Sequence, residues 1–180
     1  AMGVFIKREV LPTWFTLNLS CPNTEDDPTG AQTESSARNM CGYVMQFLNK
    51  NQVDVPLWVK ISPRLAPEQY ATMLKVFHEL GIKAVIATNT LGMPSPEDDT
   101  LTAGVGGGLL HKEATTALTL LRNASIEHGY NVDLIGCGGL LNGDSYSSFK
   151  NLDVAAVQYW SALIFRGPFA AAIIQSEYKP

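Results

Sequence analysis

The sequence predicts an α/β fold built from parallel strands and intervening helices. Five short apolar segments, rich in β-branched and aromatic residues, alternate with segments whose apolar residues recur at helical spacing. Such a repeat implies parallel strand pairing through right-handed crossovers. Part of an eight-stranded (β/α)8 barrel and a five-stranded doubly wound sheet both fit this pattern, and both place functional residues at the carboxyl ends of the strands.

Each element is predicted from its composition and from the residues that end it. Strands are predicted at residues 14–20, 57–61, 84–88, 132–136 and 154–160. Helices are predicted at residues 34–49, 67–80, 114–123, 144–151 and 168–178. The second helix illustrates the criteria, because Pro67 suits a first helical position and Gly81 follows the last apolar residue of the repeat.

The composition predicts a single domain over residues 1–180, in which residues 1–13 are a lead-in or a cloning remnant. The net charge is −4, and the 13 Lys and Arg residues form no basic run, which argues against a nucleic-acid partner. No apolar stretch approaches the roughly 20 residues of a membrane span. The three cysteines form no C-x-x-C pair, and we predict no metal site. We therefore expect a cytoplasmic protein.

Polar side chains follow several of the predicted strands. Cys21 lies in a loop directly after a strand, where its thiol is either a general base or a buried apolar filler. Lys60 lies inside the apolar strand LWVKI, so it either points inward toward an anionic ligand or extends out to solvent. Asn18 and Asn89 occupy strand positions that disfavour asparagine, which suggests that their amides recognise a planar ligand.

The remaining candidates are glycines and thiols. The glycine clusters at 104–108 and 138–139 expose backbone N–H groups that suit a phosphate, although neither forms a dinucleotide fingerprint or a P-loop. Cys41 and Cys137 lie on an amphipathic helix and an apolar strand, and we interpret both as packing residues.

The ordered set of motifs resembles dihydroorotate dehydrogenase, a family of FMN-dependent barrel enzymes of pyrimidine biosynthesis. The matching segments are NLSCPNT (18–24), VKISPRL (59–65), IATNT (86–90), AGVGGGLL (103–110), LIGCGG (134–139) and VQYWSALIFRGP (157–168). The resemblance implies that Cys21 is the base that removes a proton from dihydroorotate, and that Lys60 stabilises the reduced flavin. It implies that the substrate is held by Asn18, Asn23, Asn89 and Thr90. It also implies that FMN is bound by Asn18, Lys60, Thr88, Gly106, Gly107, Gly138, Gly139, Trp160 and Ser161.

The resemblance covers only the second half of such a barrel. The strand that carries NLSCPN is the fourth of eight in the family, and a complete barrel takes about 250 residues. We therefore expect strands four to eight, with open edges that pair with a complementing chain or with another copy, or that result from truncation by cloning or proteolysis. The alternatives are a silent flavin- or phosphate-binding fragment, a pseudoenzyme, or a related pyrimidine-reducing flavoenzyme.

Features of two enzyme classes are mixed. A cysteine base is typical of the soluble class 1 enzymes, which use fumarate or NAD. The segments KISPRL and ATNT resemble class 2, which uses quinone and is membrane-associated or mitochondrial through a segment not found in this sequence.

Overall fold

The computed structural model describes residues 2–20, 32–98 and 100–179. Within these ranges one parallel sheet has the strand order β1-β2-β3-β6-β7, and a separate antiparallel hairpin is formed by β4 and β5. The sheet strands are β1 (Phe15–Asn18), β2 (Leu57–Ile61), β3 (Ala84–Ala87), β6 (Asp133–Cys137) and β7 (Ala156–Gln158). The hairpin strands are β4 (Leu91–Pro94) and β5 (Thr102–Val105).

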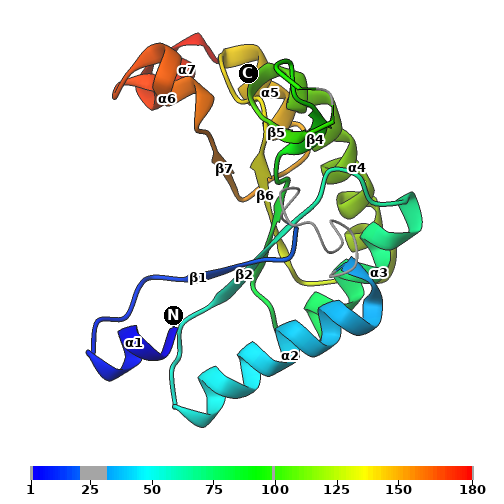
Figure 1. Cartoon of the computed structure of the whole chain (residues 1–180), viewed down its shortest axis with the longest axis vertical. Coiled ribbons are helices and arrows are strands. Elements are labelled where there is room, and N and C mark those ends of the chain that lie inside the picture. Colours follow the sequence, from blue (N-terminus) through cyan, green and yellow to red (C-terminus); the bar gives the residue numbers. More distant parts are fainter. Residues whose placement is uncertain (1, 21–31, 99, 180) are drawn as a thin grey trace.

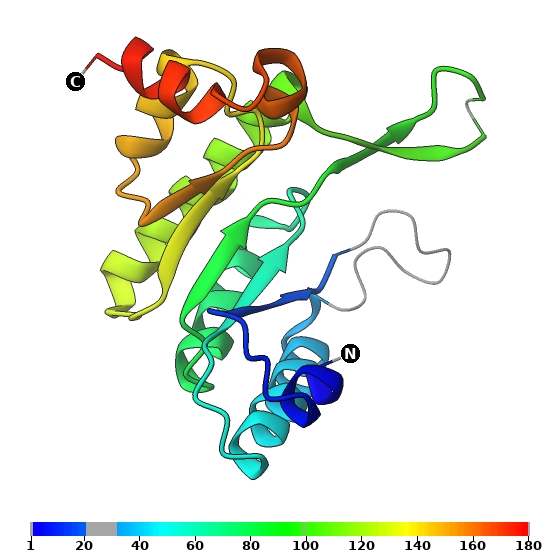
Figure 2. The same ribbon diagram turned by 90° about the vertical axis from the view of Figure 1, so that its left-hand side faces the viewer.

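Helices precede, connect and follow the strands of the sheet. They are α1 (Met2–Lys7), α2 (Glu34–Lys50), α3 (Pro67–Glu79), α4 (His111–His128), α5 (Gly143–Lys150), α6 (Ser161–Arg166) and α7 (Ala170–Glu177), and a 3-10 helix, η2 (Gly107–Leu110), precedes α4. Figures 1 and 2 show α2, α3 and α4 side by side on one face of a curved sheet, whose opposite face is concave.

The strand order identifies part of a barrel wall. A doubly wound sheet reverses its strand order at a switch point and carries helices on both faces. In the described residues the five strands follow one another in chain order without reversal, and the curved sheet does not close. The partial barrel is therefore confirmed, and the doubly wound alternative is wrong.

The strands alternate between two environments. In β2, Leu57, Val59 and Ile61 are buried in the main core against the helices, whereas Trp58 and Lys60 are half-buried on the concave face. Because side chains alternate along a strand, this pattern assigns one face of β2 to the helices and the other to the inside of the barrel. The prediction that Lys60 points inward is consistent with this placement.

The predicted elements reappear with small shifts in their ends. The largest shift concerns α4, which extends beyond the predicted 114–123 at both ends and stops at Gly129, a residue in the left-handed conformation with φ of 67°. The last strand is shorter than the predicted 154–160, because Trp160 already caps α6. The sequence analysis predicted neither α6 nor the hairpin.

The segment before β1, which the sequence analysis interpreted as a lead-in or a cloning remnant, contains a helix. Met2–Lys7 form helix α1, which the sequence analysis did not predict. The rings of Phe5 and Phe15 meet edge to face, with centroids 6.3 Å apart, so this helix packs against the start of β1.

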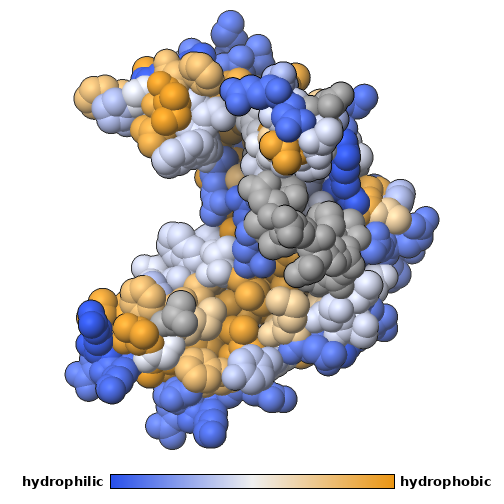
Figure 3. All heavy atoms as spheres, viewed as in Figure 1, coloured by the Kyte–Doolittle hydropathy of each residue, from blue (hydrophilic) through white to orange (hydrophobic). Residues whose placement is uncertain are grey.

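Both edges of the sheet are open and apolar. Among the described strands, β1 pairs only with β2, and β7 only with β6. Exposed apolar side chains accompany each edge: Val4, Phe5, Val10, Leu11 and Trp14 lie near β1, and Trp160, Ile164, Phe165 and Phe169 follow β7. Figure 3 shows that the surface of the molecule is hollowed between the parts that carry these two edges. No helix in the described ranges is both long and apolar enough to cross a membrane.

Candidate functional site

A cavity of about 140 Å³ lies at the carboxyl ends of β2, β3, β6 and β7. Most of the candidate residues from the sequence analysis line this cavity, and they come from segments as far apart in the chain as Lys60 and Ser161. The cavity is lined by Lys60, Thr88, Asn89, Thr90, Gly106, Gly107, Leu110, Cys137, Gly138, Gly139, Leu140, Gln158, Tyr159, Trp160 and Ser161. Parallel strands place their carboxyl ends at one edge of the sheet, which is why these separate motifs meet there.

Asn18 joins this group through Asn89. The Asn89 amide Nδ2 donates to Asn18 Oδ1 at 3.2 Å and to the backbone oxygen of Ser20. Asn89 Oδ1 accepts from the Thr90 backbone N–H at 2.9 Å. The two asparagines thus stabilise the ends of β1 and β3. The sequence analysis had predicted only ligand recognition for these side chains and had not predicted this structural role.

Lys60 lies beside Asn18 in the register of β1 and β2. The side chain is half-buried, and its ammonium Nζ donates to Cys137 Sγ of β6 at 3.5 Å, across the one intervening strand, β3. None of the ion pairs found in residues 2–20, 32–98 and 100–179 includes Lys60, so this positive charge is not neutralised by a described carboxylate. A partly desolvated cation of this kind favours an anionic group in the cavity.

Glycines form the opposite wall. Gly139 has φ of 71°, and a Cβ added there would lie 2.5 Å from His111 Cβ and 2.9 Å from the carbonyl oxygen of Gly107. Gly107, with φ of 69°, approaches the Ser161 side chain, whose Oγ would be 3.1 Å from an added Cβ. The turns after β5, β6 and β7 therefore meet closely, and glycine allows both the left-handed backbone and the contact. Clustered backbone N–H groups of such turns suit an anion.

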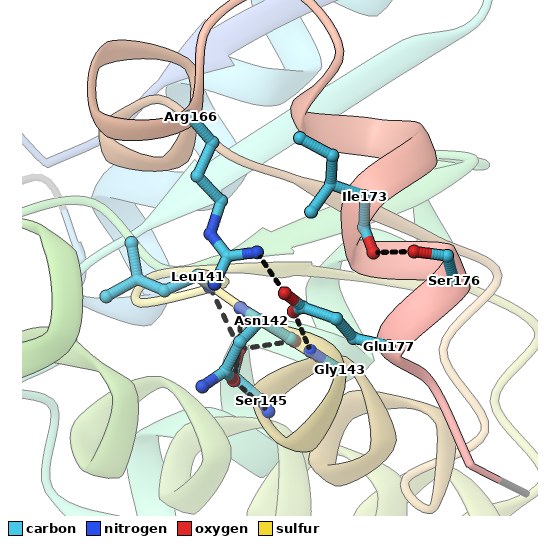
Figure 4. Close-up of polar contacts among 8 residues, drawn as sticks. All are labelled: Leu141, Asn142, Gly143, Ser145, Arg166, Ile173, Ser176 and Glu177. Carbon is cyan, nitrogen blue, oxygen red and sulfur yellow. Dashed lines mark hydrogen bonds and ion pairs between the residues drawn. The ribbon is translucent and has the colours of Figure 1, made fainter.

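A polar network fixes the segment that carries Ser161 (Figure 4). Arg166 Nη1, at the end of α6, forms an ion pair with Glu177 Oε1 of α7 at 2.6 Å. Glu177 Oε2 also accepts from the Gly143 backbone N–H at the start of α5, at 3.1 Å. The Arg166 guanidinium lowers the pKa of the Glu177 carboxyl, with a smaller contribution from that N–H. Helices α5, α6 and α7 are thereby held together behind the glycine wall.

The cavity has the size and the polar groups to hold part of a phosphate-bearing ligand. Its volume is below the roughly 300–1,000 Å³ of pockets for whole drug-sized ligands. The glycine wall and Ser161 provide neutral donors that suit a phosphate, while Lys60 and Thr88 lie on the sheet side.

The structure differs from the sequence analysis at Cys137. We interpreted this residue as a packing thiol, yet it is half-buried and lines the cavity beside Lys60. The alternation of side chains along β6 could have predicted this placement. Leu134 and Gly136 face the helices, so Ile135 and Cys137 lie on the opposite, concave face of the sheet. Gln158 and Tyr159 were also missed as lining residues. Cys21 and Asn23 lie outside the described residues, so their assignments remain predictions.

Comparison with known proteins places this arrangement in a family. The profile of the dihydroorotate dehydrogenase family matches residues 5–179. The chain is 31% identical over 166 residues to dihydroorotate dehydrogenase (quinone) of Bordetella pertussis, and 30% identical over 166 residues to that of Delftia acidovorans. Each of these alignments covers 86% of this chain and 46% of the relative. The chain therefore spans about half the length of the curated relatives that it matches.

Solved structures give the same fold. The crystal structure of DHODH from Eimeria tenella in complex with ferulenol superposes with a TM-score of 0.79 at 22% identity. That superposition covers 92% of this chain and 48% of the Eimeria chain. The ligand-free form from the same organism gives a TM-score of 0.77.

Proposed function

This chain belongs to the dihydroorotate dehydrogenase family, and we propose that its cavity binds the phosphate end of FMN in a barrel that oxidises dihydroorotate to orotate. The observation that carries this proposal is the convergence of Lys60, two glycine turns and the turn that carries Ser161 on one cavity at the carboxyl edge of the sheet. The family is flavin-dependent in general, and the donors in the cavity are the kind that a flavin phosphate requires.

The chain's own residues have separate roles in this proposal. Gly107, Gly139 and Ser161 bind the phosphate, and Lys60 stabilises negative charge on the ring system through its ammonium, which forms no ion pair within the described residues. Asn18 and Asn89 orient the substrate, and Cys21 takes the proton from its C5 carbon. The flavin, when bound, supplies the acceptor for the hydride that leaves C6 of dihydroorotate.

FMN binding is the first test. We would titrate the chain with FMN and follow the flavin absorption spectrum and fluorescence. A perturbed spectrum is expected, and Lys60→Met should weaken binding by about tenfold, since one lost charge interaction of about 1.4 kcal/mol has that effect. Lys83→Met, the same change at the opposite end of the sheet, is the matched control. No spectral change with the unaltered chain would contradict the cofactor proposal.

Substrate turnover is a separate test. Anaerobic addition of dihydroorotate should bleach the bound flavin and release orotate, and Cys21→Ala should abolish bleaching while FMN remains bound. Bleaching by dihydrouracil instead of dihydroorotate would favour a related pyrimidine-reducing enzyme. Bound flavin that no substrate bleaches would favour a silent fragment.

We propose quinone as the electron acceptor, because the Bordetella and Delftia relatives carry that word in their names. The reduced protein should be reoxidised faster by a soluble quinone than by fumarate or NAD. Faster reoxidation by fumarate or NAD would assign the chain to the other class, as the cysteine at position 21 suggests.

Further strand–helix units of the same fold should cover the two open edges. Exposed apolar side chains and unpaired strand edges favour association, and a barrel requires eight strands where the described residues supply five. Light scattering coupled to size exclusion should show association of the isolated chain, reduced by Phe165→Glu, a change at a side chain that is 81% exposed. A stable monomer would contradict this expectation.

A further inference from the structure

His111 lies directly behind the turn that carries Gly138 and Gly139, and the proposed function gives it no role. It is the first residue of α4, and its side chain is half-buried. Its ring Nδ1 is 3.4 Å from the carbonyl oxygen of Gly138, within hydrogen-bond distance. Because a carbonyl oxygen only accepts, the imidazole is the donor, which assigns the Nδ1–H tautomer to neutral His111.

The His111 ring is held in this position by its packing. It meets the ring of Phe149 edge to face, with centroids 5.2 Å apart. Phe149 is completely buried, and it packs so closely under β6 that a Cβ added at Gly136 would lie 2.8 Å from its ring. A Cβ added at Gly139 would lie 2.5 Å from the Cβ of His111. The imidazole therefore has little room to turn away from the Gly138 carbonyl.

The peptide group between Gly138 and Gly139 uses one of its two polar groups. Both glycines are buried. Among the residues that the structure describes, His111 is the one donor to the Gly138 carbonyl, and the Gly139 N–H donates no hydrogen bond. Buried backbone N–H groups are nearly always paired, so an unused N–H in the wall of a cavity indicates that a ligand supplies the acceptor.

The direction of the Gly139 N–H follows from the contact with His111. The peptide bond between the two glycines is trans, and in a trans peptide the carbonyl and the N–H point in opposite directions. The Gly138 carbonyl points to His111, so the Gly139 N–H points away from that side chain. Gly138 and Gly139 line the cavity, whereas His111 is not among the lining residues.

We propose that His111 is a positioning residue, which holds the Gly138 carbonyl so that the Gly139 N–H faces the cavity and donates to the phosphate of the ligand. A clamp is needed here because φ is 132° at Gly138 and 71° at Gly139, and glycine on both sides lets a peptide group rotate. This role rests on the proposed function, since it concerns the same phosphate site.

The first experiment detects the hydrogen bond without any ligand. The chain is labelled with 15N at its histidines, and NMR at a pH where the imidazoles are neutral shows which ring nitrogen carries the proton. Free histidine carries it mainly on Nε2. We expect His111 to carry it on Nδ1, and His128, which is exposed at the other end of α4, to carry it on Nε2. Loss of one signal in His111→Asn assigns the resonance, and an Nε2–H tautomer at His111 would overturn the proposal.

The second experiment compares FMN with riboflavin, which has the same ring system and ribityl chain but no phosphate. Affinities are measured by flavin fluorescence. His111→Leu should weaken FMN binding by about tenfold, since a hydrogen bond to a charged group contributes about that much, and should leave riboflavin affinity within about twofold. His111→Asn should retain most of the FMN affinity, because its side-chain amide also donates. His128→Leu, the same change at the far end of α4, is the matched control and should leave both affinities unchanged.

The comparison separates a positioning role from a general effect on the fold. A fold defect weakens the binding of both flavins, so equal losses for FMN and riboflavin would overturn the proposal. The same holds if His111→Asn binds FMN as weakly as His111→Leu. If circular dichroism shows that His111→Leu is unfolded, His111→Phe replaces it, because it keeps an aromatic ring beside Phe149 and lacks the donor. An unaltered chain that binds neither flavin would contradict the proposed function, and the tautomer measurement then still decides whether His111 holds the Gly138 carbonyl.

Discussion

Burial of the Cys41 thiol makes the stability of the fold sensitive to alkaline pH. The thiol has a reference pKa of 9.0, and burial raises its pKa to about 12 in the folded chain. Because the folded state keeps the proton that the unfolded state releases, the stabilisation is fully present below the unfolded value. It is then lost as the pH rises toward the folded value. Integrating this linkage from about pH 8 to about pH 10 gives a loss of about 1.4 kcal/mol.

Urea unfolding monitored by circular dichroism at the two pH values measures this loss. Cys41→Ala is the matched variant, because it removes the titrating group and keeps every other thiol, tyrosine and lysine. Its own cavity cost is nearly the same at both pH values and cancels when the two are compared. The unaltered chain should therefore lose about 1.4 kcal/mol more than Cys41→Ala between these pH values. Equal losses would show that the thiol reaches water or titrates at its ordinary pKa.

Two further predictions concern the cavity wall and the network behind it. Gly139→Ala should destabilise the fold by about 3 kcal/mol or more and abolish FMN binding, because its Cβ would meet His111 at 2.5 Å. Gly81→Ala, with the similar φ of 72° but nothing within 4 Å, should cost only about 1 kcal/mol in the same unfolding assay, and equal costs would refute the contact argument. The Arg166 guanidinium lowers the pKa of Glu177 in the folded state, so the ionised carboxylate stabilises the fold, and this stabilisation is lost as the pH falls through the folded-state pKa. Glu177→Gln removes the titrating group, so the stability of this variant should depend less on pH in the acid range. Thermal melts of both chains between neutral and acid pH test this, and parallel curves would contradict it.

Sequence periodicity predicted the sheet strands because they are short apolar segments that end in breakers. Residues 57–61 match β2 in full, and the predicted helix 67–80 differs from α3 by one residue. The hairpin β4–β5 was missed because Gly92, Pro94 and Gly104 disfavour strands, and its pairing depends on contact between two segments rather than on composition. Helix α6 was missed because it is only six residues long.

For the candidate site, as for the fold, the sequence predicted the residues but not the contacts between distant segments. Motif order identified ten residues that line one cavity, but it could not reveal that Cys137 meets Lys60, since 77 positions separate them in the chain. Nor could it show that Asn18 and Asn89 bind one another at the strand ends. Such contacts depend on strand register, which the pairing of whole strands sets.

The sequence by itself determined the alternation of strands and helices, the family, and the residue types available for chemistry. Those features are local, because periodicity, breakers and motifs act over a few residues. Only the tertiary structure decided between a barrel wall and a doubly wound sheet, and only it paired Lys60 with a thiol on β6. The physical reason is that packing between distant segments sets the curvature of the sheet, the register of its strands and the approach of the glycine turns. In such packing a side chain contacts residues that are far from it in the sequence.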